Sequence, residues 1–163
     1  MIAVAFDPGV TTGAAVGTLE DGKMFVRSTQ HRLDHLQLWQ QLELLKPDYV
    51  ITEDFEFRRK SPEGLILYSL ELIGVMEVWT ALNKKPLFRQ KASQGKGYYT
   101  NTILKANLVY QAGPRYTHAM DAVRHLLHWY TFGWGYQLNI AGFGPEAKKN
   151  VPKLPKRTVY KKG

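Results

Sequence analysis

The pattern of apolar and polar residues predicts an α/β domain that begins with three antiparallel strands. An uninterrupted apolar run at 2–6 ends at Asp-Pro-Gly, which is typical of a central strand followed by a turn. Strands expected at 13–19 and 24–29 flank an Asp-Gly pair, which indicates a hairpin. The three segments therefore form the first part of a sheet.

Helices and strands alternate after the hairpin. Leucines and one tryptophan recur at three- and four-residue intervals over 31–46, so this segment is predicted to be an amphipathic helix that ends before a proline. A short strand is expected at 49–52. A helix at 61–82 then begins with serine, proline and glutamate, which suit a helix cap and first turn.

The predicted helix at 61–82 is apolar almost all round, with only Glu71 and Glu77 charged in its middle. Covering one face of a sheet would use about half of this surface. The other half needs a second partner. A subunit interface, which would make the protein a homodimer, and a second buried layer of the same fold both explain the pattern.

The last third of the domain is predicted to be mostly helical. A fifth strand is expected at 87–90, and the polar, glycine-bearing segment 91–100 is interpreted as a loop. Helices follow at 101–111 and 117–132. This order of elements predicts a five-stranded mixed sheet flanked by helices.

Charge divides the chain into a domain at 1–144 and a basic tail at 145–163. The 163-residue chain carries a net charge of +8, and the tail supplies +6 of it, from seven basic residues against one acid. Such a tail is interpreted as a flexible arm that contacts phosphates, although a solubilising tail explains it too. The basic residues are Lys148, Lys149, Lys153, Lys156, Arg157, Lys161 and Lys162.

Composition also bears on the compartment. The chain has no cysteine, no basic N-terminal leader and no apolar run long enough to span a bilayer. We therefore expect a soluble protein without a membrane partner, located in the cytoplasm.

Three acids occupy positions where an isolated carboxylate would be poorly placed. Asp7 and Glu53 end apolar strands, and Asp121 lies inside an apolar helix. Together they could form an oxygen cage for Mg²⁺ or Mn²⁺. Asp7 alone could equally be a turn residue, and Glu53 could face solvent on an edge strand. His118, one helical turn before Asp121, could bind the metal or hold a water molecule, or it could be structural.

These residues resemble a known family. Asp7-Pro-Gly-Val-Thr-Thr-Gly13, Glu53 and His118-Ala-Met-Asp-Ala122 are similar in order and spacing to the RuvC-type Holliday junction resolvases of the RNase H-like superfamily. The resemblance implies an RNase H-like fold and two divalent ions, Mg²⁺ or Mn²⁺, bound by Asp7, Glu53, His118 and Asp121. Histidine replaces the commoner aspartate at 118. A resolvase of this size would suit a bacterial virus, acting in the host cytoplasm, as well as a bacterium.

The resemblance further implies a homodimeric crossover junction endonuclease that leaves 5′-phosphate and 3′-hydroxyl ends. Lys96 would lie near the scissile phosphate, although a solvated loop lysine is an equally simple interpretation. Aromatic and basic residues after Glu53 could stack on unpaired bases and hold the DNA backbone. The expected DNA contacts are Phe55, Phe57, Arg58, Arg59, Lys60, Lys91, Lys96 and the tail residues Lys148, Lys149, Lys156 and Arg157.

Two other functions also fit these sequence features. The chain could be a catalytically silent protein that binds branched DNA as a scaffold. An ATP phosphotransferase of the actin and sugar-kinase type also opens with an Asp-x-Gly-x-Thr pattern, but it needs a second domain for which 163 residues leave little room.

Overall fold

A five-stranded mixed sheet organises the chain. The computed structural model describes residues 1–21, 23–55, 63–107 and 109–133. Within these, the sheet order is β3-β2-β1-β4-β5, with β1, β2 and β3 antiparallel and with β4 and β5 parallel to β1. The predicted five-stranded mixed sheet is therefore confirmed. Its strands are β1 (Ile2–Asp7), β2 (Thr12–Glu20), β3 (Lys23–His31), β4 (Tyr49–Glu53) and β5 (Leu87–Gln90).

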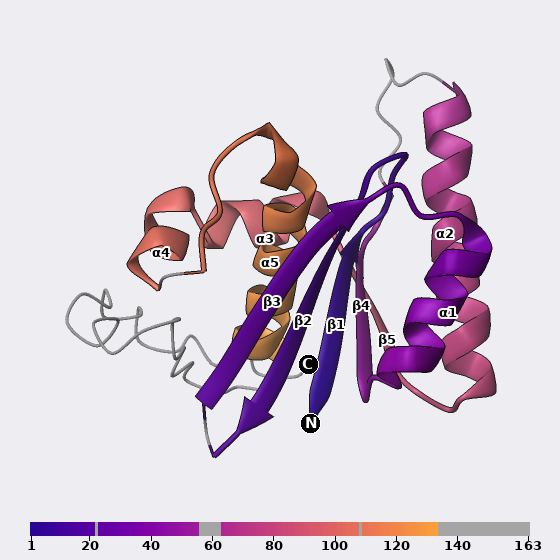
Figure 1. The fold of residues 1–163 in the computed structure, drawn as a ribbon, viewed down its shortest axis with the longest axis horizontal. Coiled ribbons are helices and arrows are strands. Elements are labelled where there is room, and N and C mark those ends of the chain that lie inside the picture. The colour runs from indigo at the N-terminus through magenta and orange to yellow at the C-terminus, as the bar shows by residue number, and fades with distance from the viewer. Residues whose placement is uncertain (22, 56–62, 108, 134–163) are drawn as a thin grey trace, which may run out of the picture.

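Helices cover both faces of this sheet, as Figure 1 shows. On one face lie α1 (His35–Leu45) and α2 (Glu63–Leu82). On the other lies α5 (Thr117–His128), with α3 (Ala92–Tyr98) and α4 (Asn101–Ala106) beside it. The three-layer arrangement buries one apolar cluster on each side of the sheet.

Alternation along β1 decides which way its side chains point. Val4 and Phe6 are buried in the cluster beneath α1 and α2, whereas Ala3 and Ala5 are buried in the cluster beneath α5. Since successive side chains of a strand point to opposite faces, Asp7 continues the row of Ala3 and Ala5. The strand therefore ends with a carboxylate on the α5 face.

The interpretation of 91–100 as a loop is wrong, because Ala92–Tyr98 forms helix α3. Its glycines suggested irregular backbone, but Gly95 has a packing role. A Cβ atom there would lie 3.2 Å from the backbone of Arg124 and His125, so glycine lets α3 pack closely on α5. This packing brings Lys96 of α3 beside α5.

Three other helix boundaries differ from the prediction. The helix predicted from residue 31 begins at His35, because β3 continues to His31 and Asp34 caps the helix by accepting from Gln37 N at 2.7 Å. Helix α4 ends at Ala106 rather than at 111. Helix α5 ends at His128 and continues as a wider π-helical turn over Trp129–Gly133.

Helix α2 uses part of its apolar surface against α1 and the sheet. Leu72, Met76 and Trp79 are buried, and Trp79 Nε1 donates to Glu43 Oε1 on α1 at 2.7 Å. A second apolar face of α2 remains exposed. It comprises Leu67, Leu70, Val78 and Leu82, and we call it the α2 stripe.

Candidate active site

The proposed acids Asp7 and Glu53 end neighbouring strands at the same edge of the sheet. Parallel strands β1 and β4 pair Phe6 with Thr52, so the next residue on each strand is the acid. Strand β5 extends this row, because Gln90 is the register partner of Glu53. Two carboxylates and one amide thus lie side by side below α5.

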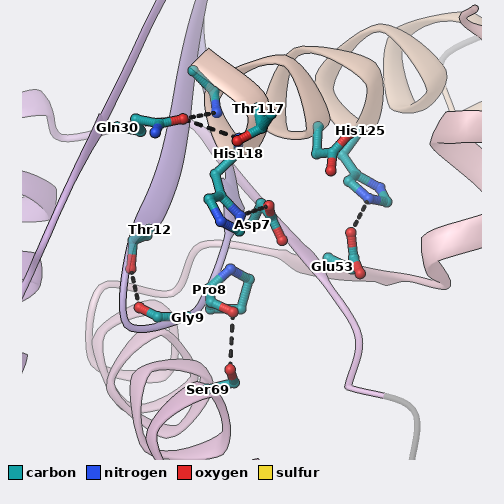
Figure 2. Close-up of polar contacts among 12 residues, drawn as sticks. Asp7, Pro8, Gly9, Thr12, Gln30, Glu53, Ser69, Thr117, His118 and His125 are labelled. Carbon is teal, nitrogen blue, oxygen red and sulfur yellow. Dashed lines mark hydrogen bonds and ion pairs between the residues drawn. The ribbon is translucent and has the colours of Figure 1, made fainter. Parts of the chain in front are cut away.

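Helix α5 crosses this row and carries one partner for each acid of the sheet (Figure 2). His118 Nδ1 lies 2.7 Å from Asp7 Oδ2, and two turns later His125 Nε2 lies 2.9 Å from Glu53 Oε2. Asp121 lies between the two histidines on the same side of the helix. The four residues expected at a metal centre therefore come from three elements and meet at one place.

These residues line a hollow of about 290 Å³ at the carboxyl end of the central strands. Asp7, Glu53, His118 and Asp121 all contribute to its wall. We call this cavity the acidic hollow. Its other lining residues are Pro8, Asp54, Phe55, Ser69, Ala92 and Lys96.

Burial and crowding change the electrostatics of Asp7. Loss of solvent raises the pKa of its carboxyl group, and the charges on Glu53 and Asp121 raise it further, while the hydrogen bond from His118 opposes the rise. The same hydrogen bond raises the pKa of His118 above its usual range. A cluster of acids that repel one another in a partly buried hollow favours binding of a cation.

Asp121 is held by two cations from different sides. Lys96 Nζ lies 2.9 Å from Oδ2, and Arg124 Nη1 donates to Oδ1 at 2.6 Å. Burial alone would lower the pKa of Lys96, but the hydrogen bond to Asp121 and the charges of Asp121, Glu53 and Asp7 outweigh it and raise that pKa. The lysine ammonium therefore interacts with all three carboxylates.

Two residues of the antiparallel strands hold the N-terminus of α5 against the sheet. Gln30 Oε1 accepts from the backbone N–H groups of His118 at 3.0 Å and Ala119 at 3.2 Å, which satisfies two unpaired donors of the first turn. Gly13 leaves room for that turn, since a Cβ atom there would lie 2.0 Å from the His118 carbonyl oxygen. Together they fix the position of His118 over Asp7.

The turn after Asp7 is held by one side chain from β2 and one from α2. Thr12 Oγ1 donates to Gly9 O, and Ser69 Oγ of α2 donates to Pro8 O, both at 2.9 Å (Figure 2). The Asp-Pro-Gly segment is therefore a structured turn, and the carboxylate at its start also belongs to the acidic hollow.

The expected DNA contacts lie in different parts of the chain, and their contact with DNA stays a prediction. Phe55 lines the acidic hollow and also packs against the core cluster under α2. Lys91 is exposed just before α3 and does not line the hollow. The other expected contacts lie outside the described residues, namely Phe57, Arg58, Arg59, Lys60, Lys148, Lys149, Lys156 and Arg157.

The donor set of the acidic hollow fits a hard divalent cation, because it consists of carboxylates and one imidazole. In the described part of the chain, no three histidine, aspartate or glutamate side chains are already grouped to hold one ion. Asp7 pairs with His118, and Asp121 pairs with Lys96 and Arg124. A metal ion bound there would compete with these basic partners for the carboxylate oxygens. Among the described residues, no helix has the length and apolarity to cross a membrane.

Sequence reasoning did not assign four of the residues that build the site. Arg124, Gln90, Gln30 and His125 were not among the expected site residues. A signal for His125 was present, because it follows Asp121 by four residues and His118 by seven, on one face of the helix.

The sheet order and flanking helices define the RNase H-like fold of RuvC-type resolvases. RuvC of T. thermophilus in complex with a Holliday junction superposes with a TM-score of 0.66 and 18% identity, over 83% of this chain and 96% of that one. The predicted fold class is therefore confirmed. At the level of sequence, no protein-family model and no curated protein matches the chain.

Two other solved structures share this fold. The yeast mitochondrial Holliday junction resolvase Ydc2 matches with a TM-score of 0.59 and 12% identity, over 78% of this chain and 76% of Ydc2. The fowlpox virus Holliday junction resolvase matches with a TM-score of 0.54 and 14% identity, over 79% of this chain and 97% of the viral protein. At these identities the likeness establishes the fold.

Proposed function

We propose that the chain is a structure-selective endonuclease that resolves Holliday junctions and cuts other branched DNA by metal-dependent phosphodiester hydrolysis. The observation that carries this proposal is the meeting of Asp7, Glu53, His118 and Asp121 in one hollow. The fold supports it, because the similar solved structures are Holliday junction resolvases. The products would carry 5′-phosphate and 3′-hydroxyl ends.

In this proposal Asp7, Glu53, His118 and Asp121 hold two Mg²⁺ or Mn²⁺ ions. Bound divalent ions supply Lewis acidity and an activated water for in-line displacement at phosphorus. His118 bonds Asp7 through Nδ1, which leaves Nε2 for a ligand or a water molecule. Lys96 lies at the mouth of the same hollow, where its ammonium group would contact the scissile phosphate.

We further propose that two copies associate through the α2 stripe. Leu67, Leu70, Val78 and Leu82 recur at helical spacing, and Gly74 falls within the same face with open space where a side chain would be. The acids next to the stripe already have partners, since Glu71 pairs with His35 and Glu77 pairs with Arg89. A two-fold dimer would present two active sites to the two strands cut in a four-way junction.

Cleavage of a synthetic four-way junction tests the nuclease proposal. Wild type should cut the junction in Mg²⁺ or Mn²⁺, whereas Asp7→Asn and Asp121→Asn should bind it without cutting. Asp34→Asn is the matched control, because asparagine also caps a helix and Asp34 caps α1 outside the hollow. If wild type binds the junction and leaves it intact in both metals, the chain is a catalytically silent DNA-binding protein and the proposal is wrong.

A further inference from the structure

His125 is a fully buried polar residue with two specific partners. Its side chain is 0% exposed and lies in α5 among apolar core residues. Nε2 lies 2.9 Å from Glu53 Oε2, and Nδ1 lies 2.9 Å from Gln90 Oε1. Burial of an imidazole is costly unless both nitrogens find partners, so these two contacts define one orientation of the ring.

The register of the sheet explains why one ring reaches both partners. Glu53 and Gln90 are paired residues on the parallel strands β4 and β5, and both lie on the face that α5 covers. Gln90 is itself buried. The Gln90 amide therefore holds the ring at Nδ1, while Nε2 contacts the Glu53 carboxylate.

His125 approaches Glu53 from the core and not from the acidic hollow. Glu53 lines the hollow, whereas His125 is not among its lining residues. His118 differs in this respect, because its side chain is 45% exposed and lines the hollow. These two histidines of α5 thus contact two different acids, His118 from the solvent-accessible hollow and His125 from the closed core.

We propose that His125 is a positioning residue that, together with Gln90, holds the Glu53 carboxylate in place for a divalent cation. A ligating carboxylate is oriented by the groups that bond its other oxygen, and such partners contribute strongly to metal affinity. Glu53 is the last residue of its strand, and the contact with His125 restricts its side-chain rotamers. This inference rests on the proposed function, since it assigns a role in the same site.

Two amide variants of His125 separate its two hydrogen bonds. In His125→Gln the side-chain NH₂ group reaches about as far as Nε2 and can still bond Glu53. In His125→Asn the NH₂ group reaches only as far as Nδ1, so it can bond Gln90 but not the carboxylate. Both variants keep a buried amide, and comparison of their melting temperatures shows whether they are equally folded.

Titration calorimetry of the full chain with Mn²⁺ alone tests the role of His125 without requiring cleavage. We expect His125→Asn to bind Mn²⁺ about 10–100-fold more weakly than wild type, and His125→Gln to stay close to wild type. In junction cleavage, His125→Asn should lower kcat with little change in KM and should need more Mn²⁺ for half-maximal rate.

Three outcomes would overturn the inference. His125→Asn could bind Mn²⁺ as wild type does, both variants could weaken binding in proportion to their loss of melting temperature, or wild type could bind no Mn²⁺. Wild type that binds Mn²⁺ and fails to cut the junction contradicts the nuclease proposal alone. In that case the Mn²⁺ affinities of the two variants still support or overturn the role of His125.

Discussion

His118 Nδ1 and Asp7 Oδ2 lie 2.7 Å apart although 111 residues separate them in the chain. The bond joins the end of the first strand to the first turn of α5. It therefore connects the wall of the acidic hollow that the sheet forms with the wall that α5 forms. Its geometry depends on residues outside the bond. Gln30 holds the helix N-terminus, and Gly13 allows its close approach to the sheet.

The Asp7–His118 bond has a measurable effect on titration. Asp7→Asn removes the charged acceptor that raises the pKa of His118, so this pKa should fall toward its usual value. Because the folded-state pKa of His118 is raised, its stabilising effect is present below the unfolded pKa of about 6.5 and is lost as pH rises through the folded pKa.

NMR titration of the histidine ring protons in metal-free protein measures this shift. His128 is an internal control, because its pKa is lowered by burial and should remain low in both proteins. An unchanged His118 pKa in Asp7→Asn would show that the bond does not control its protonation.

Gly13 should not tolerate a side chain. In Gly13→Ala the new Cβ would meet the backbone carbonyl of His118, so α5 must shift away from the sheet. We expect a loss of about 1–3 kcal/mol in the free energy of unfolding, together with loss of cleavage. Gly97→Ala is the matched control, because nothing lies within 4 Å of that position and alanine favours helix α3. Urea denaturation measures the free energy of unfolding of both variants. Equal values would refute the requirement for glycine at position 13.

Removal of the Lys96 ammonium should slow cleavage more than binding. In Lys96→Met the side chain keeps its length but loses the cation that contacts Asp121 and would stabilise charge on the scissile phosphate. We expect kcat to fall about 10²-fold with a much smaller change in junction affinity. Lys23→Met removes an exposed lysine at the start of β3 and should behave as wild type. A Lys96→Met enzyme with normal kcat would exclude this role.

The α2 stripe should control the oligomeric state. Val78 is 54% exposed near the C-terminal end of the stripe, so Val78→Glu places a charge in the proposed contact between copies. Sedimentation velocity should show a dimer for wild type and a monomer for this variant. Leu44→Glu is the control, since Leu44 is 85% exposed on α1 outside the stripe. A monomeric wild type would contradict the proposed dimer.

The central features of the site could be predicted from local sequence patterns. Apolar runs ending at Asp7 and Glu53 indicated strand ends, and the three-residue spacing of His118 and Asp121 placed them on one helix face. The period of apolar residues and the spacing of polar ones are local properties of the chain, so they can be recognised without knowledge of the fold. The apolar surface of α2 was likewise visible, although its division between α1 and the exposed stripe was not.

Only the tertiary structure decided how the carboxylates are held. The contacts of Glu53 with His125 and of Asp121 with Lys96 depend on the crossing of α5 over β4 and on the packing of α3 against α5. Helix α3 itself was missed, because its glycines suggest a loop until Gly95 is seen against the neighbouring helix. Strand and helix periods determine which face a residue occupies, but the angle and distance between packed elements determine which side chains meet.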